Sequence, residues 1–241
     1  MSDNGIFAVD ELARAVPLVP VRPVVRAGPG AVAAEAVSRG WWGKRAVDVT
    51  LGIVLVLVTL PVFVIIAIVI KATSSGPVLF RQRRVGRGGK DFPMLKFRTM
   101  HTGSEEKLRS DPALHELFVQ GSHKIPSHLD PRITRVGRVL RRLSLDEMPQ
   151  LLNVVLGHMS IVGPRPVERS QLLRDYGDYQ TTYTAMRPGL TGLWQVSGRS
   201  TVQFPERALL DCHYLERCGP WTDAKILLRT PVAVFTGLGA D

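Results

Sequence analysis

The chain has 241 residues, enough for one domain with a sizeable core and a short extension. Its hydrophobic content of 45% and charged content of 22% exclude wholesale disorder, and its two cysteines exclude a disulfide scaffold. Lys and Arg outnumber Asp and Glu by 31 to 21, which gives a formal net charge of +10.

Most of this excess charge lies in one block. Residues 81–142 carry 15 Lys or Arg and 6 Asp or Glu, a net charge of +9. Such a block attracts anions, whether these are nucleic acid, an anionic membrane surface or phosphorylated substrates. Composition alone does not choose among these partners.

The N-terminal part contains a tail and a long apolar run. Residues 1–40 hold four prolines and show no sustained periodicity, so we expect a mostly disordered tail. From Val49 to Ile70 no residue is charged, and as a helix this run would be about 33 Å long, which matches a bilayer core. A buried core helix is the alternative, but a helix apolar on every side is rare in so small a domain. We therefore predict a membrane-inserted helix within residues 41–73.

Two features bear on the topology of this helix. Pro61 lies near its middle, where a proline kinks a helix. Lys and Arg flank both ends, and cations near membrane segments favour the cytoplasmic side. Both features favour a re-entrant helix with its two ends on the cytoplasmic face. Proline is also common in spanning helices, so these features alone leave a simple span open.

The remaining pattern predicts mostly helices. Residues 78–84 and 92–98 flank a glycine-rich segment and predict a β-hairpin. A helix should begin near residues 146–149 and end at Gly157, and residues 187–200 should form a glycine-rich loop. We predict further helices at residues 105–120, 134–143, 171–185, 205–217 and 221–235. The last two are amphipathic, and such helices pack on a core or lie at the lipid interface.

Common catalytic motifs are absent. The sequence has no Walker A loop, no G-x-G-x-x-G after a strand, no D-x-D triplet and no zinc-site spacing. Cys212 and Cys218 are better explained as structural residues than as metal ligands.

A pair of acids at 146 and 147 is the first candidate for chemistry. The segment 141–150 reads RRLSLDEMPQ and places Asp146 and Glu147 just after two arginines. One interpretation is a helix capping box from Ser144 to Glu147, although Pro149 favours a helix start after the acids. The other is that the arginines keep both acids ionised, ready to bind a metal or attack phosphorus. Spacing alone does not decide between them.

Two groups of cations are the other candidates. Arg165 stands between Pro164 and Pro166, which would hold its planar guanidinium rigidly toward a phosphate or a base edge. A plain surface turn explains the same residues. Lys96 and Arg98 alternate on a predicted strand and would share one face, either as a phosphate clamp or as a solvated surface.

Three of these segments, 76–100, 140–166 and 187–199, resemble in this order the bacterial sugar transferase family, also called monotopic phosphoglycosyl transferases. The similarity begins near Lys44 and runs to the C-terminus. It implies a mainly α fold with a small β-hairpin, in which a single re-entrant membrane helix and interfacial amphipathic helices surround a compact cytoplasmic catalytic domain at residues 74–241.

The resemblance also implies an activity. Members transfer a sugar-1-phosphate from a UDP-sugar to polyprenyl (undecaprenyl) phosphate and release UMP, on the cytoplasmic face of the bacterial inner membrane. This is the first membrane step of a surface glycan or exopolysaccharide pathway. The sugar, the pathway and the oligomeric state stay open, a homo-oligomer included.

The roles of individual residues follow from the same resemblance. Asp146 would be the nucleophile that forms a covalent phosphosugar intermediate, and Glu147 would serve a Mg²⁺ site together with Asp146. The family's membrane helix bends at a Ser-Pro pair, whereas this chain has Leu60-Pro61, with Thr59 as a source of the hydroxyl. The residues expected to bind the substrates are Lys96, Arg98, Arg141, Arg142, Pro164, Arg165, Pro166 and Arg199.

Two other functions deserve comparison. A membrane-tethered nucleic-acid binder should interleave aromatic residues with its cations, but residues 81–142 contain only Phe92, Phe97 and Phe118. We therefore expect no nucleic-acid partner. A non-catalytic membrane scaffold would not need the intact acid pair.

Overall fold

The structure is a computed structural model that describes residues 41, 43–120, 125–198, 202 and 204–235. The predicted disordered tail and the candidate Arg199 lie outside the described residues.

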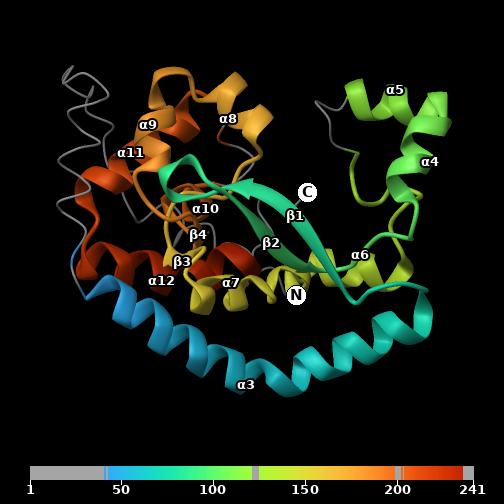
Figure 1. Cartoon of the computed structure of the whole chain (residues 1–241), viewed down its shortest axis with the longest axis horizontal. Coiled ribbons are helices and arrows are strands. Elements are labelled where there is room, and N and C mark those ends of the chain that lie inside the picture. The colour runs from blue at the N-terminus through green and yellow to red at the C-terminus, as the bar shows by residue number, and fades with distance from the viewer. Residues whose placement is uncertain (1–40, 42, 121–124, 199–201, 203, 236–241) are drawn as a thin grey trace, which may run out of the picture.

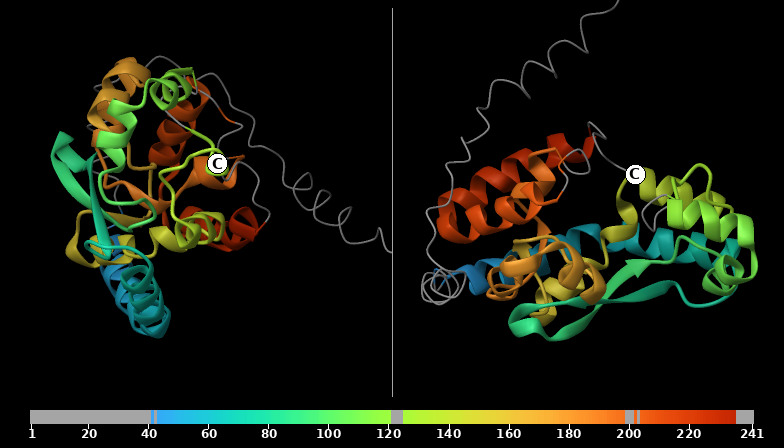
Figure 2. Two further views of the ribbon diagram at one scale, coloured as in Figure 1. Left: turned by 90° about the vertical axis from the view of Figure 1, so that its right-hand side faces the viewer. Right: turned by 90° about the horizontal axis from the view of Figure 1, so that it is seen from above.

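A long apolar helix runs along the base of the domain. Helix α3 spans Lys44–Thr73 and is, within the described ranges, the one helix long and apolar enough to cross a membrane. Only 11% of its most apolar window is buried against the rest of the protein. Figure 1 shows α3 as an arc whose concave side faces the domain, and Figure 2 shows it protruding from one side of the molecule. The helix is continuous through Pro61, and Figure 1 shows it curved along its length.

The predicted hairpin is confirmed. Strands β1 (Leu79–Val85) and β2 (Asp91–Phe97) pair antiparallel, with Leu79 opposite Phe97 and Val85 opposite Asp91. Two glycines with positive φ, Gly88 and Gly89, form the turn between them.

One predicted helix is two helices. We predicted a single helix over residues 105–120, whereas the structure has α4 (Ser104–Ser110) and α5 (Pro112–Gln120). Pro112 is the cause, because the residue before a proline avoids the helical region, and Asp111 is extended (φ −106°, ψ 103°). Helix α6 (Arg135–Arg142) follows, with the Thr134 side chain as its N-cap.

The second half holds a small sheet that the sequence pattern did not predict. Helix α7 (Gln150–Leu156) ends at Gly157 as expected. Strands β3 (Ser160–Val162) and β4 (Gly189–Thr191) then pair in parallel, and α10 (Leu193–Val196) follows directly. Residues 187–200 were predicted to be a loop, and this prediction is wrong because three-residue strands are too short to show alternation.

The C-terminal helices complete the domain. The predicted helix at 171–185 is divided into α8 (Arg169–Asp175) and α9 (Gln180–Thr184) by a turn at Gly177 with φ +46°. Helices α11 (Glu206–Arg217) and α12 (Pro220–Phe235) are close to their predicted bounds. The apolar face of α11 is buried in the domain through Ala208, Cys212 and Leu215, so it packs on the core. The fold is mainly helical with two small sheets.

Both ends of α3 are attached to this domain. At the N-terminal end, Lys44 pairs with Asp223 of α12 (Nζ–Oδ2 2.6 Å), and Arg45 donates to the carbonyl oxygens at the end of α7. At the C-terminal end, Ile66 and Ile70 pack with Phe97 and Leu140 in a buried cluster. The helix therefore contacts the rest of the domain through both its N-terminal and its C-terminal half.

Asp48 is the buried polar link between α3 and the small sheet. Its carboxylate accepts hydrogen bonds from the Ser160 hydroxyl (2.8 Å) and the Ile161 backbone N–H (2.9 Å). The residue is 4% exposed. Since hydrogen bonds to a charged acceptor are strong and a buried donor without a partner is costly, this link should contribute substantially to stability.

We predict that Asp48→Ala lowers the free energy of unfolding by about 2–4 kcal/mol, because it removes both hydrogen bonds and leaves the Ile161 N–H unpaired. Asp48→Asn keeps one acceptor oxygen in a side chain of the same shape, so its free energy of unfolding should fall clearly less than that of Asp48→Ala. Thermal unfolding in detergent micelles measures both variants. Equal losses in the two would contradict a role for the hydrogen bonds.

Candidate active site

The acid pair lies on a tight turn between α6 and α7. Ser144, which follows α6, takes a left-handed conformation (φ 55°) and is the non-glycine residue with positive φ among those the structure describes. The chain then forms a single 3₁₀ turn over Leu145–Glu147, and Pro149 is the N-cap of α7. The Ser144 side chain makes no capping hydrogen bond. The capping-box interpretation is therefore wrong, and helix α7 begins after the acids.

Asp146 is largely removed from water. Its residue is 8% exposed. Burial raises the pKa of its carboxyl from 3.8 to about 6, and the negative charge of Glu147 adds to this, while Lys96 and Arg141 act in the opposite direction. We expected the arginines to keep this acid ionised, but burial outweighs their attraction. Above pH 7 the carboxylate is still mostly ionised and able to act as a nucleophile.

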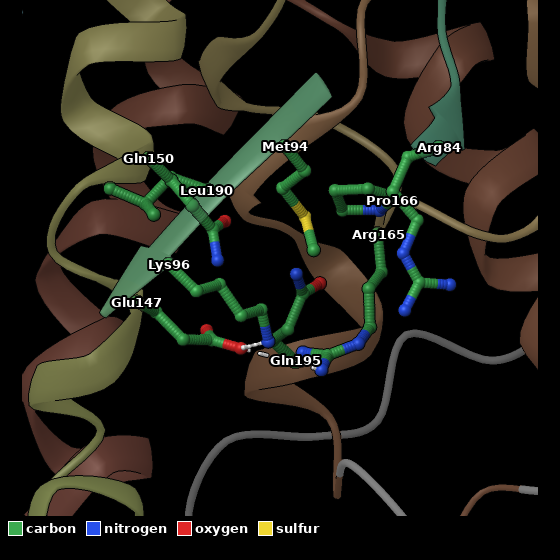
Figure 3. Close-up of a pocket in the computed structure, with 9 residues that line it drawn as sticks. All are labelled: Arg84, Met94, Lys96, Glu147, Gln150, Arg165, Pro166, Leu190 and Gln195. Carbon is green, nitrogen blue, oxygen red and sulfur yellow. Dashed lines mark hydrogen bonds and ion pairs between the residues drawn. The ribbon is translucent and has the colours of Figure 1, made fainter. Parts of the chain in front are cut away.

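Glu147 is held by two cations. Lys96 Nζ donates to its Oε1 at 2.9 Å, and Arg165 Nη2 lies 3.6 Å from the same oxygen. Lys96 comes from β2 and Arg165 from the segment after β3, so two distant parts of the chain meet at the acid turn. Figure 3 shows the three side chains converging at one edge of a cavity.

This cavity is a small hollow that is partly open to solvent, and its charge is mostly positive. Its lining consists of Arg84, Met94, Lys96, Glu147, Gln150, Arg165, Pro166, Leu190 and Gln195. Three cations and one acid favour an anionic ligand.

Four of the ten predicted site residues are brought together here. Lys96, Glu147, Arg165 and Pro166 line the cavity, and Asp146 is adjacent in the chain to Glu147. Pro164 is buried, and its carbonyl accepts from the Gly189 N–H at 2.8 Å, which fixes the Arg165 segment to β4.

Arg141 interacts electrostatically with the acid turn and does not line the cavity. Its guanidinium Nε donates to the Thr99 hydroxyl (2.9 Å), and its charge favours the ionised form of Asp146.

Two predicted residues lie elsewhere. Arg98 donates to the carbonyl and hydroxyl of Ser74 at the end of α3 (2.9 and 2.7 Å) and does not line the cavity. The guanidinium of Arg98 is therefore held at the end of α3, whereas the ammonium of Lys96 binds Glu147 at the cavity. Arg142 is exposed at the end of α6, also away from the cavity lining.

Comparison with known proteins assigns the chain to a family. Residues 39–237 match the family described as Bacterial sugar transferase, which covers most of the chain. The chain belongs to this family.

Curated relatives have similar sequences. The chain is 40% identical over 205 residues to the exopolysaccharide production protein ExoY of Rhizobium meliloti, covering 83% of this chain and 89% of that protein. It is 41% identical over 203 residues to the UDP-glucose:undecaprenyl-phosphate glucose-1-phosphate transferase of Caulobacter vibrioides, covering 80% and 70%. The undecaprenyl-phosphate galactose phosphotransferase of Salmonella typhimurium is 39% identical over 201 residues, covering 82% of this chain and 41% of that longer protein.

The cavity of this sugar transferase contains residues that sequence reasoning missed. Arg84 was counted only as one cation of the basic block, yet its buried guanidinium lines the cavity, and burial lowers its pKa. Gln150 and Gln195 also line the cavity, but they carry no charge, so the charge pattern did not indicate them. Gln195 lies in the third segment of the resemblance, which was the one available signal for it.

The acid pair of the sugar transferase fits a metal that arrives with substrate. No group of three or more His, Cys, Asp or Glu side chains is close enough to hold a metal within the described part of the chain. Mg²⁺, however, usually retains waters and binds through one or two carboxylates together with substrate phosphates. Asp146 and Glu147 beside a cationic cavity match that donor set. Cys212 is buried in the core on α11, apart from these acids.

We predict that Asp146→Asn makes the protein more stable at pH 8, by about 1–3 kcal/mol, because the variant lacks a carboxylate whose ionised form burial disfavours. Since the pKa of Asp146 is raised in the folded state, its contribution to stability is present below about pH 4 and is lost as the pH rises through 6.

The difference between variant and wild type should therefore shrink as the pH falls from 8 to 4. Thermal unfolding in chelator at both pH values measures it, with the exposed Asp178→Asn as the matched control. A variant less stable than wild type at pH 8 would contradict the raised pKa.

Proposed function

We propose that this protein transfers a sugar-1-phosphate from a UDP-sugar to undecaprenyl phosphate, with UMP as the second product, in exopolysaccharide synthesis. The observation that carries the proposal is the acid pair at the edge of a cavity lined by three cations, in a chain of the bacterial sugar transferase family. One of the relatives is named for this same reaction, the transfer of glucose-1-phosphate from UDP-glucose to undecaprenyl phosphate.

The cavity cations are suited to hold the donor's diphosphate. Lys96, Arg84 and Arg165 together offset the negative charge that would otherwise repel an approaching carboxylate. The guanidinium of Arg165 is kept in place by the buried segment after β3 and by its approach to the Trp194 ring, 5.6 Å from the centroid. Positioning of this kind contributes much of the rate in phosphoryl transfer.

We propose that Asp146 acts as the nucleophile. Its carboxylate oxygen attacks the phosphorus that bears the sugar, the bond from that phosphorus to the UMP oxygen breaks, and UMP leaves with the electron pair. The product is a mixed anhydride between Asp146 and the sugar phosphate. An oxygen of undecaprenyl phosphate then attacks the same phosphorus and releases the Asp146 carboxylate, so atoms and charges balance over the two steps.

Glu147 and Asp146 are the residues that would hold Mg²⁺ when substrate is bound. When bound, the ion neutralises charge that develops on the phosphate oxygens of the leaving nucleotide. Glu147 contributes its carboxylate from the side of the cavity where Lys96 already lies at 2.9 Å.

The membrane arrangement supports a lipid substrate. One long apolar helix indicates membrane association. The names of relatives, in which undecaprenyl phosphate appears, agree with a lipid substrate. We propose further that α3 is re-entrant, because its two ends both contact the same domain, and a straight span would carry one end about 30 Å away across the bilayer. The Thr59 hydroxyl donates to the Leu55 carbonyl (2.6 Å) one turn before Pro61, in place of the family's serine.

Helix α12 offers a second contact with lipid. Trp221, Leu228 and Val232 recur at helical spacing and are 73%, 78% and 45% exposed. The Lys225 ammonium lies 5.6 Å from the Trp221 ring, a combination typical of the lipid interface. We propose that the catalytic domain lies on the cytoplasmic face of the bacterial inner membrane, where positive charge is favoured.

The activity is tested by incubating the purified protein with a set of UDP-sugars and undecaprenyl phosphate and measuring UMP and sugar-linked lipid. We predict that wild type releases UMP with at least one UDP-sugar. Asp146→Asn should fall to background, at least 10³-fold lower, because an amide cannot form the anhydride. Asp178→Asn is the control. Substantial turnover by Asp146→Asn would contradict the nucleophile.

The metal requirement is tested separately. Excess chelator should abolish UMP release and Mg²⁺ should restore it, because the diphosphate needs a hard cation opposite the acids. Glu147→Gln should lower the rate by about 10²-fold or more and raise the Mg²⁺ concentration needed for half-maximal rate, whereas the exposed Glu106→Gln should change neither. Full activity in chelator would overturn the magnesium assignment.

The topology is tested by labelling with membrane-impermeant thiol reagents. In a background without native cysteines, single cysteines at Ser38 and Ser75 should react equally from the cytoplasmic side of inner-membrane vesicles. Pro61→Leu should straighten α3 and shift one site to the opposite side. Labelling of the two sites from opposite sides in the unaltered helix would show a simple span.

A further inference from the structure

Gln195 presents a buried amide without a partner to the cavity. It lies in α10, a single helical turn, and the residue is 8% exposed. Neither its Nε2 nor its Oε1 has a hydrogen-bond partner among the described residues, and both atoms are shielded from solvent. Buried polar groups in folded proteins are paired in the great majority of cases, so an amide with both ends unpaired requires an explanation.

The amide is held in place by its surroundings. The neighbouring Trp194 ring lies under the Arg207 guanidinium at 4.0 Å, which fixes the short helix to α11. Gly192 allows the close approach, since a Cβ at that position would lie 2.8 Å from the Gln195 oxygen and in collision with the Gly163 carbonyl. In Figure 3 the amide points into the space between Met94, Lys96 and Arg165. Packing around α10 therefore fixes the orientation of the Gln195 amide in the wall of the cavity.

The chemistry of the amide restricts what it can bind. An amide offers an acceptor oxygen beside an N–H₂ donor, so both ends are satisfied only by a ligand with a donor next to an acceptor. A phosphate only accepts, and it would leave the Gln195 oxygen unpaired. The cavity's cations, Arg84, Lys96 and Arg165, already suit phosphate. The amide fits a neutral part of the same ligand.

We propose that Gln195 is a specificity-determining residue that hydrogen-bonds a neutral donor–acceptor group of the UDP-sugar. The proposal rests on the proposed function, which supplies such a ligand. A UDP-sugar carries two groups of this chemistry: the uracil edge, where an N–H lies beside a carbonyl, and the hydroxyls of the sugar. A site that hydrogen-bonds such a group discriminates strongly against ligands that lack it.

The test compares wild type with Gln195→Met, which keeps the length of the side chain and removes both hydrogen-bonding atoms. The matched control is Gln120→Met, whose wild-type side chain is exposed on α5 and bonded to Glu116. We expect kcat/KM for the preferred UDP-sugar to fall by about 10- to 100-fold in Gln195→Met and to stay unchanged in the control. The melting temperature should be equal to wild type or higher, because a buried unpaired amide has been replaced by an apolar group.

Gln195→Glu is the second variant. It keeps the shape and the acceptor but loses the donor, so it should lose specificity even if the Met variant folds poorly. Binding of UMP, measured by calorimetry without any lipid acceptor, shows whether Gln195 binds the uracil edge or the sugar hydroxyls. Weaker UMP binding in both variants identifies the uracil edge as the bound group, whereas unchanged UMP binding with an altered order of preference among UDP-sugars identifies the sugar.

Two results would overturn the proposal. One is a folded Gln195→Met with wild-type kcat/KM for every UDP-sugar and wild-type UMP affinity. The other is a fall in melting temperature together with an equal loss of activity toward all UDP-sugars in both variants, which would show a structural amide. If wild type itself releases no UMP from any UDP-sugar, the proposed function fails, and wild-type affinity of both variants for UMP and for every intact UDP-sugar would then reject the Gln195 assignment independently.

Discussion

The attachment of both ends of α3 to one face of the catalytic domain is the constraint on which the rest of the structure depends. At one end the helix packs on Phe97, the residue next to Lys96 in β2. Near the other end, Asp48 binds the start of β3, the strand that leads to Arg165. The apolar helix thus contacts elements on both sides of the cationic cavity. Loss of either attachment would move one wall of the site relative to the other.

Two features of the acid turn lower the stability of the folded protein. Ser144 adopts a strained left-handed conformation, and Asp146 is buried deeply enough that its pKa rises to about 6 despite nearby cations. A carboxylate with little hydration is a better nucleophile toward a phosphate whose charge is already neutralised. The hydrogen bond from Lys96 to Glu147 organises the same turn. Stability and reactivity are in conflict here, which is typical of catalytic sites.

The sequence predicted much of this architecture, and the failures have physical causes. The apolar run, the hairpin, the last two helices and the acid pair could be identified because each depends on local composition or spacing. The β3–β4 sheet could not, since its strands have three residues each and pair across long sequence separation. The contact of Arg98 with Ser74 could not be predicted, because the two residues are 24 positions apart and meet only in the folded chain. Gln195 could not be assigned a role, because an unpaired buried amide is visible only when its neighbours are known.

The account makes Asp146 the site of a covalent phosphosugar, and one measurement tests this most directly. The protein is incubated with a UDP-sugar and Mg²⁺ but no undecaprenyl phosphate, quenched in acid, digested and analysed by mass spectrometry. The peptide that contains residue 146 should gain the mass of one sugar phosphate, with fragmentation placing it on Asp146, and the adduct should disappear when undecaprenyl phosphate is added before the quench. An unmodified peptide under conditions where the same preparation turns over with lipid, or an adduct on a different residue, would contradict the account.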